Sequence, residues 1–345
     1  MRALVVEAPG QFGVQEVPKP SLREGCVLLR VKACGVCGSD FSRIFGRGAH
    51  RLPLVPGHEF SGVVEELAEG VDDKWQGKRV AVFPLIPCRR CAMCSVGEYA
   101  QCAAYDYLGS RSDGAFAEYV VVPTWNLLPI PDQVSFEEAA MMEPAAVALH
   151  ALRLGGLTGG MSVIIFGAGP IGLLLAHWAK ALGCTTICLV DIDPLRLDYA
   201  KCLGFFDLFD AREDGMVSRL LDKTGGGADL VIEGSGSSAA FEQTMQAARP
   251  FGTVVLMGNP LGEMRLSQQA YWAIMRKQLH VRGTWNSSYG ESSHNDWATT
   301  LDFLATKKLC VCHLVTHRPT LEELPTLLKS VVAREVFTCK VMVLP

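Results

Sequence analysis

A glycine-rich turn set between two apolar runs constrains this 345-residue chain more than any other feature. At 161–183, MSVIIFGAGPIGLLLAHWAKALG predicts a buried strand of about five residues, then a turn, then a helix. Its glycines form the pattern G-x-G-x-x-G. Gly167 permits the tight turn, Gly169 lets a pyrophosphate approach the backbone, and Gly172 permits close packing of helix on strand. The stretch therefore predicts a dinucleotide-binding unit.

A second strand with an acidic end strengthens this prediction. The segment TTICLVD follows the helix and ends in Asp191, 19 residues past Gly172. A carboxylate there accepts hydrogen bonds from the adenosine ribose hydroxyls and repels a 2′-phosphate, which favours NAD over NADP. The helix beginning around Pro170 and Ile171 offers unpaired N–H groups to the phosphates. Arg196 lies close by in sequence, and its guanidinium could stack on the adenine or accommodate a phosphate.

Strand and helix patterns continue to alternate after Asp191. Four further strand candidates lie in DLFDA, ADLVIEGSG, GTVVLMG and HVRGTW, with helices expected up to Lys223, through Arg249 and near Gln268–Lys277. Six strands in this order predict a doubly wound parallel sheet, with the cofactor at the carboxyl ends of the strands. We therefore expect an α/β Rossmann domain over 149–291.

The first part of the chain has a different period. ALVVE, GVQEV, CVLLRVKACG, FSGVVEEL and KRVAVFP are strand-like runs without a dominant helical period. They predict a twisted, barrel-like β domain. The last part of the chain contains helical runs at 296–308 and 321–335 and a final strand, TCKVMVLP. These elements are too many for a nucleotide domain, so we expect the chain to return to the β-rich domain. The expected limits of that domain are 1–148 and 292–345.

Cys37 and His58 are metal-binding residue types, and they lie at opposite ends of a loop rich in glycine and proline. Such a loop can fold back, and Zn²⁺ accepts sulfur, nitrogen and oxygen ligands, with one position left open in catalytic sites. Glu59 follows His58, and Asp40 is a short carboxylate of the kind that accepts the second N–H of a metal-bound histidine. Ser39 is placed to pass a proton. The alternative is a buried structural cysteine and a core histidine.

Glu143 is a further candidate for the metal or the substrate. It lies at a break before Pro144, with apolar residues on both sides, and a buried carboxylate is costly unless it is paired. A capping box of Ser135 and Glu138 predicts a helix start shortly before it. The alternative is a surface carboxylate at the end of a helix.

Four cysteines lie within fifteen residues at 88–102, CRRCAMCSVGEYAQC. They are Cys88, Cys91, Cys94 and Cys102. Four thiolates on a short loop can close a tetrahedral site with no open position, which is typical of structural zinc. An iron–sulfur cluster is the alternative, but the ferredoxin spacing continues with x3-C-P after the third cysteine, and here it does not.

Composition excludes several classes of function. A net charge of -4 argues against binding to nucleic acid or to an anionic membrane surface. The sequence shows no secretory signal and no unbroken apolar run of about 18 residues, so we expect a cytoplasmic protein. The thirteen cysteines then indicate metal ligands and reduced thiols rather than disulfides.

In order along the chain, ACGVCGSD, PGHEFSG, the four-cysteine loop, EPAAVALHA and FGAGPIG resemble the zinc-dependent medium-chain dehydrogenase/reductase family. Within it the sequence is similar to the polyol and polyol-phosphate branch, in which Glu143 stands where liver-type alcohol dehydrogenases have cysteine. The segments FSRIFGRGAH, CAAYDYLGSRSDGAFAEYVVV, GTWNSSY and HRPTLEEL are similar to dehydrogenases of galactitol 1-phosphate. The resemblance implies a GroES-like catalytic domain beside the Rossmann domain.

The resemblance also implies a mechanism. Cys37, His58 and a carboxylate, either Glu59 or Glu143, would hold a zinc ion that acidifies the substrate alcohol, and Ser39 or zinc-bound water would carry the proton away. Hydride would pass to NAD. The implied substrate is galactitol 1-phosphate, oxidised to tagatose 6-phosphate, with a non-phosphorylated polyol such as sorbitol or a non-catalytic zinc- and nucleotide-binding role as alternatives.

Two further expectations concern partners. A phosphorylated substrate needs cationic groups, and the candidates are Arg43, Arg47, His50 and Arg111. Family relatives are dimers or tetramers, which implies a homo-oligomer, and the sheet edge near His280–Thr284 is the expected contact.

Overall fold

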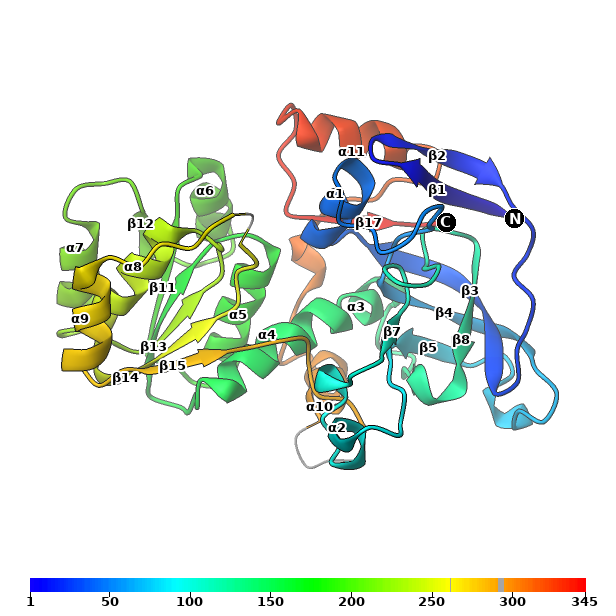
Figure 1. Ribbon diagram of the computed structural model, residues 1–345, viewed down its shortest axis with the longest axis horizontal. Coiled ribbons are helices and arrows are strands. Elements are labelled where there is room, and N and C mark those ends of the chain that lie inside the picture. Colours follow the sequence, from blue (N-terminus) through cyan, green and yellow to red (C-terminus); the bar gives the residue numbers. More distant parts are fainter. Residues whose placement is uncertain (261, 291–294) are drawn as a thin grey trace. The chain divides into compact units, whose positions relative to one another are not determined.

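The computed structural model describes residues 1–260, 262–290 and 295–345. They form two compact units, one made of Met1–Pro144 with Ser288–Pro345 and the other of Ala145–Ser287 (Figure 1). The expected domain limit between 148 and 149 falls within α4 (Met142–Leu154). The expected limit between 291 and 292 lies outside the described residues, so the domain limits stay a prediction.

A parallel sheet of six strands forms the centre of the Ala145–Ser287 unit, as far as the described residues show. The strands are β10 (Ser162–Phe166), β11 (Thr186–Asp191), β12 (Leu208–Asp210), β13 (Ala228–Glu233), β14 (Ala248–Leu256) and β15 (His280–Gly283). Their spatial order is β12-β11-β10-β13-β14-β15, so the winding reverses between β10 and β13. This order is that of a Rossmann fold, and the predicted doubly wound sheet is confirmed.

Helices connect these strands and flank the sheet (Figure 1). They are α5 (Pro170–Ala181), α6 (Pro194–Cys202), α7 (Met216–Lys223), α8 (Ser238–Ala247) and α9 (Gln268–Arg276). Asp193, Ser237 and Ser267 cap three of them by accepting backbone N–H bonds. The helix expected through Arg249 ends earlier, because Pro250 biases the residue before it toward extended backbone.

The other unit is built around β3 (Cys26–Gly35), which pairs with three strands. The sheet order is β16-β17-β3-β4-β5-β9, and β8 also pairs with β3. The other strands of this sheet are β4 (Glu59–Leu67), β5 (Arg79–Val82), β8 (Tyr119–Pro123), β9 (Leu127–Pro129), β16 (Val315–His317) and β17 (Lys340–Val343). The expected return of the final strand is confirmed, because Met342 pairs with Gly35 in antiparallel register.

Two two-stranded sheets and several short helices complete this unit. One sheet pairs β1 (Arg2–Ala8) with β2 (Gln11–Glu16), and the other pairs β6 (Leu85–Ile86) with β7 (Asp106–Tyr107). Besides the start of α4, the helices are α1 (Gly38–Phe45), α2 (Ala92–Ser95), α3 (Phe136–Ala140), α10 (Asp296–Ala305) and α11 (Leu324–Val332), with 3-10 turns η1 (Asp73–Trp75), η2 (Tyr99–Gln101), η3 (Thr124–Asn126) and η4 (Cys312–Leu314). The predicted capping box of Ser135 and Glu138 begins α3. No described helix combines the length and apolar character needed to cross a bilayer.

Candidate metal centres and dinucleotide site

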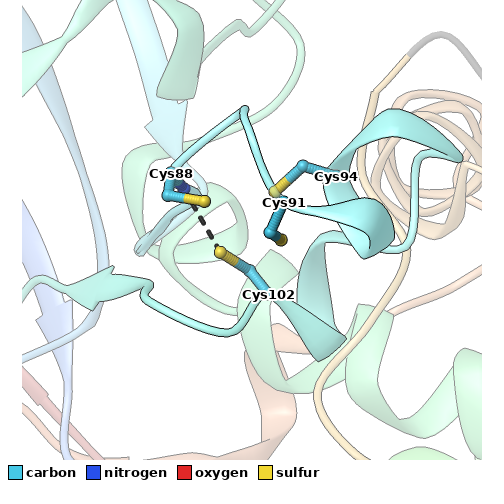
Figure 2. Close-up of side chains that lie close together, drawn as sticks. All are labelled: Cys88, Cys91, Cys94 and Cys102. Carbon is cyan, nitrogen blue, oxygen red and sulfur yellow. Dashed lines mark hydrogen bonds between the residues drawn. The ribbon is translucent and has the colours of Figure 1, made fainter.

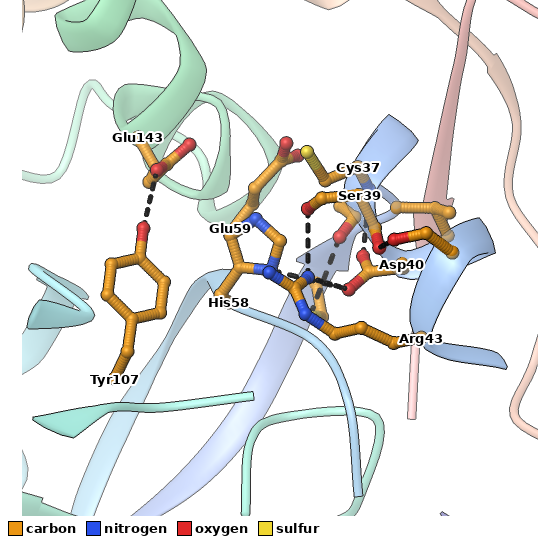
Figure 3. Close-up of polar contacts among 12 residues, drawn as sticks. Cys37, Ser39, Asp40, Arg43, His58, Glu59, Tyr107 and Glu143 are labelled. Atoms are coloured by element: carbon orange, nitrogen blue, oxygen red, sulfur yellow. Dashed lines mark hydrogen bonds and ion pairs between the residues drawn. The ribbon is translucent and has the colours of Figure 1, made fainter. Parts of the chain in front are cut away.

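The antiparallel register of β3 and β4 brings Cys37, His58 and Glu59 together. Gly35, at the end of β3, lies opposite Glu59, so Cys37 at the start of α1 faces the segment that enters β4. One donor atom from each of the three lies within 4.8 Å of the others (Figure 3). Sulfur, imidazole nitrogen and carboxylate oxygen form a set that suits zinc, and three protein ligands leave one position open.

Asp40 lies behind the imidazole of His58. Its carboxylate accepts a bond from the backbone N–H of Cys37 at 2.9 Å, and its Oδ1 lies 3.4 Å from His58 Nδ1. Burial acts to lower the pKa of His58, but the negative charges of Asp40 and Cys37 outweigh it and raise this pKa well above its ordinary value. Asp40 is fully buried, which matches its expected role of orienting a metal-bound histidine.

Lys340, on β17, completes this site and was missed by the sequence analysis. Its Nζ donates to Glu59 Oε2 at 2.7 Å, to Glu59 Oε1 at 2.9 Å and to the Val36 carbonyl at 3.0 Å. Both charged side chains are almost fully buried. A lysine within the apolar run CKVMV was the available signal, since lysine is rarely buried unless it is paired.

Glu143 lies close to the three donors but bonds elsewhere. Its Oε1 accepts from Tyr107 Oη at 3.0 Å, and it is not one of the three residues whose donor atoms meet (Figure 3). Burial raises the pKa of Glu143 to about 7, with the charge of Glu59 acting in the same direction and His58 opposing both. The described geometry thus gathers Glu59 with Cys37 and His58, while the choice of carboxylate ligand stays a prediction.

Arg43 is bound within the site. Its Nη1 donates to Ser39 Oγ at 2.8 Å and to Asp40 Oδ1 at 3.0 Å, and only 14% of its side chain is exposed. The Ser39 hydroxyl therefore accepts a bond from a cation, which favours release of its own proton. Arg43 was one of four residues expected to bind a phosphate. In the structure its Nη1 is instead bonded to two neighbours in the same helix.

The four cysteines of the 88–102 loop also meet. One sulfur from each of Cys88, Cys91, Cys94 and Cys102 lies within 4.8 Å of the others, and all four are free thiols (Figure 2). Backbone N–H groups, that of Ala103 first, lower the pKa of Cys91 to about 6, whereas burial raises the pKa of Cys94 to about 12. Four converging sulfurs on a short loop fit a closed tetrahedral zinc site.

The glycine-rich turn has the geometry that its sequence predicts. Gly167 adopts φ 107°, in the left-handed region, and Gly169 caps α5, whose first residue is Pro170. A Cβ on Gly172 would collide with the Gly167 carbonyl oxygen, so only glycine permits this close approach. Asp191 ends β11 beside the turn.

The Asp191 carboxylate is tied to this turn and to the next helix. Its Oδ2 accepts from the Ala168 N–H at 2.7 Å and lies 3.4 Å from Arg196 Nη1. Its Oδ1 accepts from the Asp193 N–H at 2.9 Å. Oδ1 keeps a second lone pair, so a bond to a ribose hydroxyl remains available.

Comparison with protein families assigns both parts of the chain. Residues 23–132 match the alcohol dehydrogenase GroES-like domain, and residues 170–306 match the zinc-binding dehydrogenase family. These matches confirm the expected pairing of a GroES-like domain with a dinucleotide-binding domain.

Two characterised relatives extend over almost the whole chain. Galactitol 1-phosphate 5-dehydrogenase of Escherichia coli K12 is 35% identical, with all of both chains covered. Sorbitol dehydrogenase of Bacillus subtilis is 31% identical, covering 100% of this chain and 97% of its own.

Solved structures of dehydrogenases have the same fold as this chain. The crystal structure of E. coli galactitol-1-phosphate dehydrogenase superposes with a TM-score of 0.92, 34% identity and full coverage of both chains. An E. coli short chain alcohol dehydrogenase complexed with NADH gives 0.90 at 28% identity, and a zinc-binding dehydrogenase of Sinorhizobium meliloti bound to NADP gives 0.89 at 29%, each covering 100% of this chain and 99% of its own. With its converging metal donors and its glycine turn, the chain therefore belongs to the zinc-type alcohol dehydrogenase family.

Proposed function

We propose that the protein oxidises a secondary alcohol of a polyol phosphate with NAD, converting galactitol 1-phosphate to tagatose 6-phosphate. The observation that carries the activity is the meeting of Cys37, His58 and Glu59 donor atoms within 4.8 Å. Full-length similarity to a galactitol 1-phosphate dehydrogenase supports the substrate.

Cys37, His58 and either Glu59 or Glu143 would hold the catalytic zinc. When bound there, zinc supplies a Lewis acid that lowers the pKa of the substrate alcohol. Asp40 fixes the ring of His58, and Lys340 balances the charge of Glu59. The four-cysteine loop would hold a second, structural zinc.

Ser39 would carry the alcohol proton away from the substrate. The Arg43 guanidinium donates to its Oγ, so the hydroxyl can release its proton toward solvent while a cation stabilises the remaining charge. Arg43 thereby links the proton path to Asp40, because the same Nη1 contacts both.

NAD is the proposed cofactor. The α5 N-terminus and Gly169 would receive the pyrophosphate, with Ile171 in the first helical turn, and Asp191 would accept bonds from the ribose. Asp191 is buried beside Gly167, where a carboxylate opposes a 2′-phosphate. Arg196, 3.4 Å from Asp191, would stack on the adenine.

We also propose a homo-oligomer, a dimer or a tetramer, that uses β15. This strand ends the sheet order, and His280, Val281, Arg282 and Gly283 are all exposed. An exposed strand edge is a ready template for pairing with a second copy. Light scattering coupled to size exclusion tests it, and a monomeric holoenzyme would reject it.

A substrate comparison tests the function. NAD reduction by zinc-replete protein is measured with galactitol 1-phosphate, with sorbitol, and with NADP in place of NAD. The proposal requires a higher kcat/KM for galactitol 1-phosphate and for NAD. Equal or better turnover of sorbitol would favour the non-phosphorylated alternative, which similarity to the B. subtilis sorbitol enzyme supports.

A further inference from the structure

One exposed arginine of the metal-binding unit carries a positive charge without a matching carboxylate among the described residues. Arg111 lies in the tight turn after β7, and its guanidinium carbon lies 4.4 Å from the centre of the Tyr105 ring. No carboxylate of the described residues lies within ion-pair distance of it. A guanidinium that packs over a ring can still offer N–H groups to an anion.

His50 lies in the loop before His58, close enough for the charge of Arg111 to act on it. Desolvation lowers the pKa of His50, and the positive charges of Arg111 and Arg43 lower it further. A protonated His50 ring would thus be repelled by both guanidinium groups. Repulsion of this kind is relieved when an anion binds between them.

The nearby carboxylates are used elsewhere. Asp113 pairs with Arg51 and accepts a bond from the Val55 N–H at 3.0 Å. Asp40 bonds Arg43 and the Cys37 N–H, as described above. Neither of these two carboxylates pairs with Arg111 or His50.

A row of aromatic rings connects Arg111 with His58. The rings of His58 and Tyr107 have centroids 5.7 Å apart, and those of Tyr107 and Tyr105 have centroids 6.4 Å apart, with Arg111 on the far ring. The turn itself is well held, because the N–H groups of Ser110, Arg111 and Ser112 all donate to the Tyr107 carbonyl. Arg111 is therefore separated from His58 by two tyrosine rings.

We propose that Arg111 and His50 form the subsite for the phosphate monoester of the substrate, while Arg43 serves the proton path instead. This inference rests on the proposed function. It assigns the phosphate to two of the four cations expected from the sequence, and it makes Arg111 the main determinant of specificity for phosphorylated over free polyols.

The test compares the ratio of kcat/KM for galactitol 1-phosphate to kcat/KM for galactitol. Arg111→Ala should lower this ratio by about 10- to 100-fold, since hydrogen bonds to a charged group are lost. Arg111→Lys should lower this ratio less, because lysine keeps the positive charge but cannot form the bidentate hydrogen bonds of a guanidinium. Arg23→Ala, an exposed arginine of the same unit, is the matched control and should keep the ratio. An unchanged ratio in Arg111→Ala would overturn the subsite.

A second measurement separates the subsite from the proposed function. Inorganic phosphate is titrated calorimetrically into wild type, Arg111→Ala and His50→Asn. Weaker binding by both variants supports the subsite, even if wild type prefers sorbitol and the proposed function fails. Equal binding by all three would reject the subsite, even if galactitol 1-phosphate is the best substrate.

Discussion

Lys340 Nζ lies 2.7 Å from Glu59 Oε2, and the two side chains are 3% and 1% exposed. Glu59 is also one of the three residues whose donors meet beside β4. A carboxylate in this position needs a counter-ion whenever it is ionised, because an unpaired charge in the interior is strongly destabilising. Lys340 supplies that charge from a distant strand.

Lys340→Met should therefore lower the free energy of unfolding of the protein stripped of its catalytic zinc by about 3–5 kcal/mol, since it leaves a buried carboxylate without its partner. Chemical denaturation measures the loss. Adding Glu59→Gln to this variant should recover part of it. Lys78→Met, at an exposed position beside β5, is the control, and an equal loss in both single variants would contradict the prediction.

Asp40→Asn should weaken zinc binding or activity by about 10- to 100-fold, because the imidazole of His58 loses its anionic partner. Competition with a chelator measures the affinity, and zinc content by elemental analysis gives the stoichiometry. Asp72→Asn, at an exposed turn, is the control. Unchanged retention of zinc together with unchanged turnover would show that Asp40 does not orient the ligand.

Substitutions in the two cysteine sites should separate stability from turnover. Cys94→Ser should lower the melting temperature and reduce bound zinc by one ion per chain, since structural zinc contributes folding free energy. Cys37→Ser should abolish NAD reduction. Its circular dichroism spectrum should stay unchanged, because the fold remains intact. The assignment of the two sites would be wrong if these outcomes were exchanged.

Glu138 should contribute stability that disappears in acid. Burial acts to raise its pKa, but bonds from Lys307 and Ser135 outweigh this, and the pKa lies below its ordinary value of 4.5. A lowered pKa means that the contribution is complete above the unfolded value and is lost as the pH falls through the folded value. Lys307 is about half exposed, so solvent screening keeps the effect small.

Glu138→Gln tests this pH dependence. The difference in free energy of unfolding between wild type and the variant should be largest above about pH 5 and shrink as the pH falls further. Glu335→Gln, at an exposed position, should show no such trend. A difference that grows toward acid pH would contradict the assigned direction.

Much of the fold and part of the site follow from local sequence patterns. The glycine turn, the four-cysteine loop and the pair His58 and Glu59 are each specified by residues close together in the chain. Spacing constrains such groups directly, because a short loop can reach only a few arrangements. The doubly wound parallel sheet followed from the alternation of strands and helices.

Contacts between distant segments could not be predicted in the same way. The bonds of Lys340 to Glu59 and of Tyr107 to Glu143 depend on strand register and on the path of a loop. Arg43 looked like a free cation because nothing in its neighbourhood in the sequence reveals that its Nη1 contacts Asp40 and Ser39 together.

The placement of β17 against β3 has a consequence for biosynthesis. A ribosome makes Glu59 early, and 281 positions separate it from Lys340. A nascent chain that has reached only the Rossmann domain therefore leaves Cys34 and Gly35 of β3 without their partner strand β17 and carries a carboxylate with no ammonium to pair with it. Maturation of the metal-binding unit must wait until translation has passed the dinucleotide domain, which makes the order of domain folding partly a matter of timing.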